Sequence, residues 1–178
     1  MFFYQLSISL YFLVIKIAAL FNPKAKLWIE GRENIFDKLQ EVKFNKNTYW
    51  FHCASLGEFE QAKPLIEKLG KQDPTIKFLI TIFSPSGYEF AKKYHAADYV
   101  FYLPLDTPSN AKRFIELVNP KKVFFVKYEF WYNYLFQLSK HKIPTYLISG
   151  VFRKNQLFFK WYGTTHKKMI SFFTHFFV

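Results

Sequence analysis

From Thr48 onward, short apolar runs alternate with longer segments whose apolar residues recur at helical spacing. The runs are Thr48–Cys53, Ile76–Phe83, Tyr99–Leu103, Lys122–Lys127 and Ile143–Ser149. Strand runs of five to eight residues separated by helices are typical of βαβ units, because parallel strands need a long crossover connection. The sequence therefore predicts an α/β fold built on a mostly parallel sheet.

The segments between these runs predict helices. Their approximate ranges are 57–69, 86–94, 108–118, 129–140 and 159–170. Pro64 in the first helix is tolerated only near the first turn or with a kink. A last apolar run, Phe172–Val178, predicts a buried strand. Natural chain ends are more often polar and exposed, so this run also predicts that the polypeptide continues beyond Val178.

The segment from Phe2 to Phe21 predicts membrane association. It has twenty residues, about the span of a bilayer core, and Lys16 is its only charge. Lys24, Lys26 and Arg32 follow, and the positive-inside rule then places the rest of the chain in the cytoplasm. The alternative is an amphipathic helix that lies on the membrane or docks on the domain. We expect an anchor or interfacial helix over residues 1–22 and a domain over residues 23–178.

The net charge of +12 predicts an anionic partner: nucleic acid, a phospholipid surface or a phosphorylated substrate. The charge is uneven, since residues 121–178 hold ten Lys and Arg side chains but one acid, Glu129. Such a carboxylate is either a buried ion-pair partner or a functional residue of a site. A single cysteine, Cys53, excludes a disulfide framework and a Cys-based zinc site, and the five histidines show no metal-ligand spacing.

Ligands of open parallel sheets bind beyond the carboxyl ends of the strands. The loops after Cys53, Phe83, Leu103, Lys127 and Ser149 should therefore form the functional edge. We call this side of the sheet the carboxyl edge.

The first of these loops, Ala54-Ser55-Leu56-Gly57-Glu58, leads into a predicted helix. Gly57 allows close approach to the backbone, and a helix N-terminus presents N–H groups to an anion. Glu58 at this point could serve as a general base that accepts a proton from an attacking hydroxyl. Ser55-x-x-Glu58 is also a capping box, in which both side chains satisfy helix-end N–H groups. A glutamine at position 58 separates the two roles, because it keeps the cap but cannot accept the proton.

Two further loops carry candidate residues. Ser84, Ser86 and Gly87 could hold a phosphate through hydroxyl and N–H groups, or they simply begin a helix; the loop lacks the Gly-Lys ending of a P-loop. Glu129 follows another strand at the same edge. Its structural alternative is an ion pair with Lys127 or Arg153.

Four motifs resemble those of one family. Residues 50–59 (WFHCASLGEF), with Pro64-Leu65-Ile66, resemble the first motif of the Kdo (3-deoxy-D-manno-octulosonic acid) transferases. Residues 80–87 (ITIFSPSG), 102–108 (YLPLDTP) and 129–131 (EFW) are similar to the second, third and fourth. Order and spacing match those of the family. Tyr132 stands where many members have proline, and Ser149-Gly150-Val151 stands where many have Asn-Ala-Arg.

The resemblance implies a glycosyltransferase of the two-domain GT-B architecture in lipopolysaccharide core biosynthesis. Such enzymes transfer Kdo from CMP-Kdo to the lipid A precursor, lipid IVA, with inversion and without a metal or other cofactor. This chain would be the N-terminal Rossmann-like domain that binds the acceptor, at the cytoplasmic face of the cell inner membrane. The donor would bind a C-terminal domain that this chain lacks, so the chain alone would be inactive.

The resemblance also assigns roles to residues. The catalytic base of the family falls on Glu58, and Glu129 corresponds to a second essential carboxylate. The expected acceptor-binding residues are Ser55, Leu56, Gly57, Ser84, Ser86, Gly87 and Arg153. No metal ligand is expected.

Two other functions compete with this one. The first is a non-catalytic, membrane-associated module that binds an anionic lipid or sugar. The second is a basic α/β protein that binds nucleic acid. No recognition helix, aromatic RNP pattern or basic arm is present, and the apolar N-terminus argues against a nucleic-acid partner.

Overall fold

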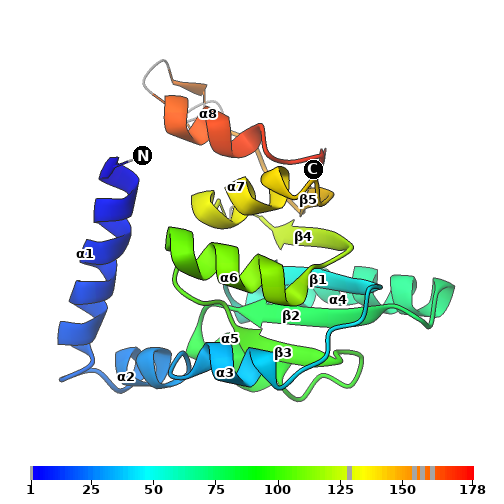
Figure 1. Cartoon of the computed structure of the whole chain (residues 1–178), viewed down its shortest axis with the longest axis horizontal. Helices are drawn as coiled ribbons and strands as arrows, with labels where there is room; N and C mark the ends of the chain where they lie inside the picture. The colour runs from blue at the N-terminus through cyan, green and yellow to red at the C-terminus, as the bar shows by residue number, and fades with distance from the viewer. Residues whose placement is uncertain (1, 128–129, 154–155, 157–158, 161–162) are drawn as a thin grey trace.

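A six-stranded sheet in which all neighbouring strands run parallel forms the centre of the protein (Figure 1). The structure, a computed structural model, describes residues 2–127, 130–153, 156, 159–160 and 163–178. The strands are β1 (Thr48–Cys53), β2 (Lys77–Ile82), β3 (Tyr99–Tyr102), β4 (Lys122–Val126), β5 (Thr145–Ile148) and β6 (His175–Phe177). The predicted parallel α/β fold is confirmed.

Helices cover both faces of this sheet. They are α1 (Phe2–Ala18), α2 (Pro23–Glu30), α3 (Ile35–Gln40), α4 (Leu56–Gln72), α5 (Pro85–Ala91), α6 (Pro108–Val118), α7 (Tyr132–Lys140) and α8 (Thr164–Ile170). Because successive side chains of a strand point to opposite faces, neighbouring residues of β1 enter different cores. Trp50 packs with residues of α3, α6, α7 and α8, whereas Phe51 packs with residues of α4 and α5. Both are fully buried, which explains why β1 is apolar throughout.

The strand order is β3-β2-β1-β4-β5-β6, the order of Rossmann folds. The chain builds outward from β1 to β3 and then returns to β4 on the other side of β1. The connections after β1 and after β4 therefore diverge, and ligands of such sheets bind in the crevice between them. The loops that follow Cys53 and Val126 border this switch point.

Several predicted elements differ from the observed ones. The sequence did not predict α2 or α3. Pro64 lies inside α4, beyond its first turn. The run from Phe172 was expected to be a buried strand, which is wrong: among the described strands β6 pairs with β5 alone, and Phe177 is 52% exposed. An edge strand buries less of its surface than a central strand, whatever its composition.

The N-terminal segment forms a shorter helix than its apolar length indicates. α1 ends at Ala18, and Asn22 then caps α2 by accepting a hydrogen bond from the Lys24 N–H at 2.9 Å. Across the residues that the structure describes, no helix has both the length and the apolar character needed to cross a membrane.

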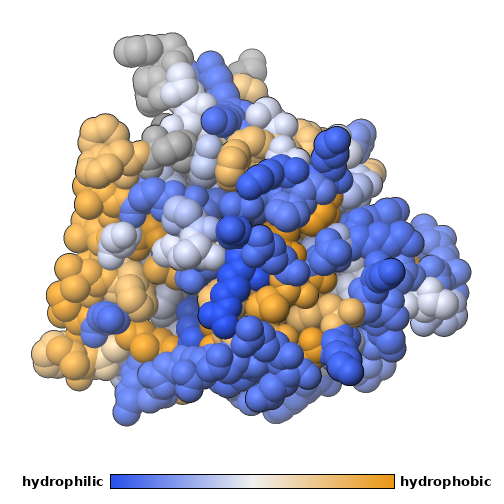
Figure 2. Space-filling view, viewed as in Figure 1, coloured by the Kyte–Doolittle hydropathy of each residue, from blue (hydrophilic) through white to orange (hydrophobic). Residues whose placement is uncertain are grey.

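One side of α1 is apolar and exposed, and Figure 2 shows it as a continuous hydrophobic flank of the molecule. Phe3 is 81% exposed and Leu13 is 53% exposed. Together with Leu20 and Phe21, which follow the helix, this side forms what we call the N-terminal apolar surface; its other exposed residues are Phe2, Phe3, Leu6, Leu10, Leu13, Val14 and Ile17.

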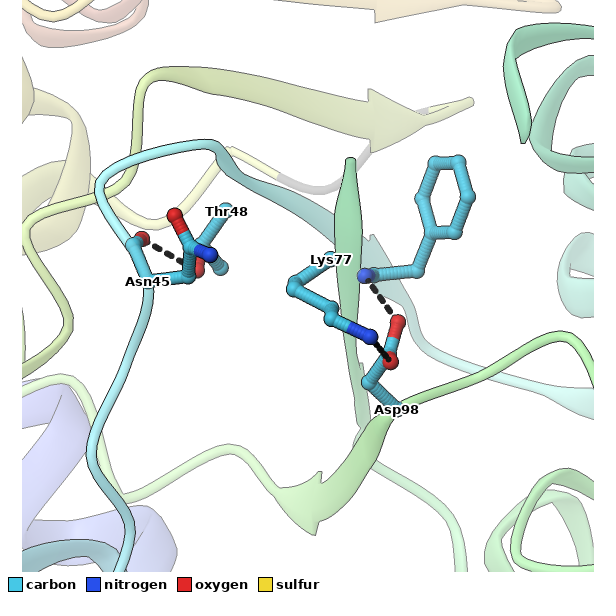
Figure 3. A network of polar contacts seen from close by, with 5 residues as sticks. Asn45, Thr48, Lys77 and Asp98 are labelled. Atoms are coloured by element: carbon cyan, nitrogen blue, oxygen red, sulfur yellow. Dashed lines mark hydrogen bonds and ion pairs between the residues drawn. The ribbon is translucent and has the colours of Figure 1, made fainter. Parts of the chain in front are cut away.

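The amino ends of the strands are held by a separate polar network (Figure 3). Asp98 accepts hydrogen bonds from the Lys77 ammonium at 2.7 Å and from the Phe78 N–H at 2.8 Å. The Thr48 hydroxyl donates to the Asn45 carbonyl at 2.6 Å. These contacts lie at the end of the sheet opposite to the carboxyl edge, so their role is structural.

Candidate active site

The loop after β1 places Glu58 at the carboxyl edge. Ser55 is the N-cap of α4, and its Oγ accepts a hydrogen bond from the Glu58 N–H at 3.4 Å. In return, Glu58 Oε2 accepts a hydrogen bond from the Ala54 N–H, which lies one residue before the position used in a standard capping box. The half-buried Glu58 carboxylate is thereby folded back over the end of β1.

This capping geometry is compatible with a proton-accepting role. A helix N-terminus carries a partial positive charge, which favours the ionised form of a nearby carboxylate. The two alternatives for Glu58, cap and base, therefore do not exclude each other.

The loops after β1 and β2 are joined to one another. The Ser84 N–H donates to the Ala54 carbonyl at 2.9 Å. Gly87 is buried in α5, and a Cβ added to it would lie 3.0 Å from the Leu56 backbone nitrogen. A larger residue at position 87 would push the two loops apart. The structure thus brings Ser55–Glu58 and Ser84–Gly87 together.

Individual residues of these loops differ in their surroundings. The Ser84 Oγ already accepts a hydrogen bond from the Gly87 N–H at 3.2 Å as the N-cap of α5, whereas Ser86 is exposed. A Cβ added to Gly57 would meet no atom within 4 Å, so packing within the described chain does not require glycine there. The open surface at Gly57 lies directly beside Glu58 on the first turn of α4.

A buried polar network connects β1 to the loop after β4. The Trp131 indole N–H donates to His52 Nε2 at 3.1 Å, so Nε2 must be unprotonated and the neutral ring carries its proton on Nδ1. His52 Nδ1 lies 3.1 Å from the carbonyl of Thr81 and 2.9 Å from its hydroxyl. His52 is fully buried, so it is part of the packed interior of the sheet.

Aromatic rings cover the same edge from the side of α1 and α2. Phe83, in the loop after β2, stacks on Trp131 at a centroid distance of 5.0 Å and packs against Trp28 and Tyr11. The Arg32 guanidinium lies 3.7 Å from the Trp28 ring. These contacts attach the N-terminal helices to the loops at the carboxyl edge.

Arg32 is a feature that the sequence did not predict. Its guanidinium donates to the carbonyls of Leu103, Trp28 and Phe83 at 2.8–2.9 Å and so connects the ends of β2 and β3 to α2. Burial lowers the pKa of Arg32 to about 9. The three carbonyls that Arg32 contacts lie on separate segments, so no local pattern in the sequence predicted this set of contacts.

Asp106 is a second unpredicted feature of this edge. It follows β3 within the third motif and is 1% exposed. Burial raises the pKa of its carboxyl to about 6, against the opposing effect of the hydrogen bonds that it accepts. The sequence had indicated only the start of α6 at this position.

The remaining predicted residues lie in the loops after β4 and β5. Glu129 lies outside the described residues. Arg153 is exposed, and its described hydrogen bonds are local: its backbone N–H donates to Gln156 Oε1 at 2.7 Å, and its carbonyl accepts from the Gln156 N–H at 3.0 Å. No described contact joins Arg153 to the loops after β1 and β2. In the described part of the chain, no cluster of three or more His, Cys, Asp or Glu side chains could hold a metal ion.

Comparison with known proteins identifies 3-deoxy-D-manno-octulosonic acid transferases as relatives. The family model described as 3-deoxy-D-manno-octulosonic-acid transferase matches residues 29–178. A 3-deoxy-D-manno-octulosonic acid transferase of Aquifex aeolicus is 35% identical over 112 residues, which make up 62% of this chain and 30% of the relative. That of Haemophilus influenzae is 36% identical over 96 residues, 53% of this chain and 22% of the relative. The matched segment is therefore less than a third of the length of either relative.

The fold has a counterpart among solved structures. A crystal structure of UDP-N-acetylglucosamine 2-epimerase superposes with a TM-score of 0.54 and 14% identity, over 75% of this chain and 42% of that chain. At this level of identity the likeness supports the fold alone.

Proposed function

The chain belongs to the 3-deoxy-D-manno-octulosonic acid (Kdo) transferase family, and we propose that it is the acceptor-binding half of an inverting GT-B glycosyltransferase. In this proposal the complete enzyme transfers Kdo from CMP-Kdo to the lipid A precursor, lipid IVA. The observation that carries it is the family match over residues 29–178, which includes Glu58 at the switch point of the sheet. A Rossmann-like sheet with this strand order supports the GT-B assignment.

Glu58 would act as the general base. Its carboxylate would take the proton of an acceptor hydroxyl while the hydroxyl oxygen forms a bond to the anomeric carbon of Kdo. The bond from that carbon to the CMP phosphate oxygen breaks, and CMP leaves. The contacts of Glu58 support this role, because the Ala54 N–H orients the carboxylate at the carboxyl edge. Glu129 would supply a second essential carboxylate.

The acceptor would lie over the joined loops after β1 and β2. Ser55, Leu56 and Gly57 border Glu58, and Ser84, Ser86 and Gly87 lie on the adjacent loop. Arg153 would approach from the loop after β5. CMP-Kdo would be bound mainly by a C-terminal domain, and the chemistry would need no metal or other cofactor.

Membrane association fits a lipid acceptor. In the sequence, Lys16 lies within the segment that forms the N-terminal apolar surface, and Lys24 and Lys26 follow it. Basic residues near a membrane are attracted to anionic headgroups. We propose that α1 lies on the cytoplasmic face of the inner membrane with this surface in the lipid. The site at the carboxyl edge would then lie close to the bilayer that holds its acceptor.

The test is transfer of radiolabelled Kdo to lipid IVA by the product of the complete reading frame that contains this chain. We expect a Kdo-modified lipid that appears only with CMP-Kdo present and that still forms in the presence of a metal chelator. The 178-residue chain alone should bind lipid IVA without transfer. Binding of lipid IVA by both proteins and transfer by neither would support the non-catalytic module instead.

A further inference from the structure

Asp106 connects three segments that are distant in the sequence. Its Oδ2 accepts hydrogen bonds from the Tyr4 hydroxyl of α1 and from the Asn133 N–H of α7, the latter at 3.1 Å. Its Oδ1 accepts a hydrogen bond from the Tyr134 N–H at 3.1 Å. Both oxygens of a buried carboxylate are thus engaged by groups from α1 and α7.

Asp106 caps a helix other than its own. The N-cap of α6 is Thr107, whose hydroxyl accepts a hydrogen bond from the Asn110 N–H at 3.2 Å. The N-cap of α7 is Trp131, which makes no capping hydrogen bond with its side chain. The first N–H groups of a helix need acceptors from outside the helix, and for α7 the Asp106 carboxylate supplies two of them.

α1 adds a second layer to the same junction. The Tyr4 hydroxyl, besides donating to Asp106, accepts a hydrogen bond from the Tyr132 N–H at 3.2 Å. The neighbouring Gln5 side chain exchanges hydrogen bonds with the Asn133 side chain, the shorter of them 2.8 Å long. The amino-terminal half of α1 is therefore attached to the first turn of α7.

The first turn of α7 directly follows the loop that leaves β4. That loop contains Trp131, which the His52 contact holds on its other side. Trp131 and the first turn of α7 are thus held from two sides, by His52 within the sheet and by Asp106 and Tyr4 at the start of α7. A shift of the first turn of α7 would displace Trp131 relative to the switch point.

We propose that Asp106, together with Tyr4, is a positioning residue for Trp131 and the first turn of α7. Asp106 and Tyr4 keep Trp131 against His52 and Phe83 at the carboxyl edge, next to the loop that carries Glu58. The inference rests on the proposed function, since it takes the transfer of Kdo as the reaction for which this edge is aligned. It assigns to α1 a role in the site in addition to its contact with the membrane.

The kinetic test compares Tyr4→Phe, Asp106→Asn and the double variant in the complete protein. Misplacement of a catalytic segment by about 1 Å can cost on the order of a hundredfold in rate. We expect each single variant to lower kcat by about tenfold, with KM for lipid IVA changed by less than about twofold. Because both residues act through one junction, the double variant should be no slower than the slower single variant.

Tyr146→Phe is the matched control, since Tyr146 lies on β5 and packs against Phe124 and Phe177 on the other face of the sheet. Its kcat should equal that of the wild type. All rates are normalised to the folded fraction, so that a loss of stability alone would leave kcat per folded molecule unchanged. An unchanged kcat in the two single variants, or two effects that multiply in the double variant, would overturn the proposal.

Amide hydrogen exchange in the 178-residue chain tests the same junction without any transfer assay. In Tyr4→Phe the Tyr132 N–H loses its acceptor and should exchange about tenfold faster, while the Leu147 N–H in the sheet keeps its wild-type rate. An equal exchange rate of the Tyr132 N–H in the wild type and in Tyr4→Phe would refute the contact between Tyr4 and the first turn of α7. If the wild-type complete protein transfers no Kdo, the proposed function fails, and this measurement still decides whether Tyr4 holds α7.

Discussion

At the residue scale, two acidic side chains of the carboxyl edge occupy different environments. Glu58 is half-buried on the first turn of α4, with one oxygen accepting the Ala54 N–H. Asp106 is buried, and its hydrogen bonds only partly offset the desolvation of its charge. The first environment suits a residue that exchanges protons with a substrate, and the second suits a residue that holds structure together.

Replacing Glu58 with Gln separates the cap from the base. The amide oxygen of Gln can still accept the Ala54 N–H, so the free energy of unfolding should change by less than about 1 kcal/mol. Loss of the proton acceptor should lower kcat for Kdo transfer at least about a hundredfold. Glu60→Gln is the control, since Glu60 is exposed on the same helix and pairs with Lys63. Full activity of Glu58→Gln would show that Glu58 is only a cap.

Asp106 should make stability depend on pH in an unusual direction. Its pKa rises from 3.8 in the unfolded chain to about 6 in the folded protein. The folded state therefore holds the proton more tightly, and this contribution to the free energy of unfolding is lost as the pH rises from about 3 to about 7, through the folded pKa. The loss amounts to about 3 kcal/mol.

The measurement is urea unfolding of the wild type and Asp106→Asn across that pH range. The difference in unfolding free energy, wild type minus variant, should fall as the pH rises, because effects of other groups cancel. A difference that stays flat or rises would contradict a raised pKa at Asp106.

At the scale of elements, α1 has two unlike sides. One side contacts the loops at the carboxyl edge through Tyr4 and Tyr11, and the first turn of α7 through Gln5. The opposite side belongs to the N-terminal apolar surface, which is contiguous in Figure 2. Large contiguous apolar patches on a protein surface mark interaction sites. A helix with these two sides can contact a membrane and the site at the same time.

Leu13→Asp should weaken binding to phospholipid vesicles. Burial of a leucine side chain contributes about 1.5–3 kcal/mol, so the substitution should reduce vesicle affinity at least about tenfold. Phe177→Asp is a control matched in exposure, since Leu13 is 53% exposed on α1 and Phe177 is 52% exposed on β6. Cosedimentation with vesicles measures the affinity of both variants. An equal loss of vesicle affinity in Leu13→Asp and Phe177→Asp would argue against a specific role of α1.

At the scale of the whole molecule, the net charge of +12 complements this apolar surface. Ten of the basic residues lie between 121 and 178, the part of the chain that forms β4, β5, β6 and the helices between them. Charge and apolar area together favour an anionic membrane over nucleic acid, because duplex binding gains nothing from an exposed apolar helix.

The salt dependence of binding can distinguish these partners. The chain should bind vesicles with anionic lipid more tightly than zwitterionic vesicles, and the difference should largely vanish between about 0.05 M and about 0.5 M salt, where charges are screened. Binding to zwitterionic vesicles should persist, since it depends on the apolar surface. Duplex DNA bound more tightly than anionic vesicles, with a steep salt dependence, would instead support a nucleic-acid partner.

The accuracy of the predicted elements depends on the kind of signal behind them. The bounds of β1 and α6 were predicted correctly, because a continuous apolar run marks the first and Thr107-Pro108 begins the second. The loops that carry Ser55–Glu58 and Ser84–Gly87 were expected at one edge, and the structure joins them there. The contacts of Arg32 and Asp106 were not predicted, since their partners lie up to about a hundred residues away.

The sequence by itself determined the parallel α/β fold, the family and the loop that holds Glu58, because periodicity, caps and motifs depend on residues that are neighbours in the chain. Only the tertiary structure decided that Asp106 caps α7, that Arg32 joins α2 to two strand ends, and that α1 lies against the carboxyl edge. A buried charge needs partners wherever the fold places them. Those partners come from distant segments, so no local pattern records them.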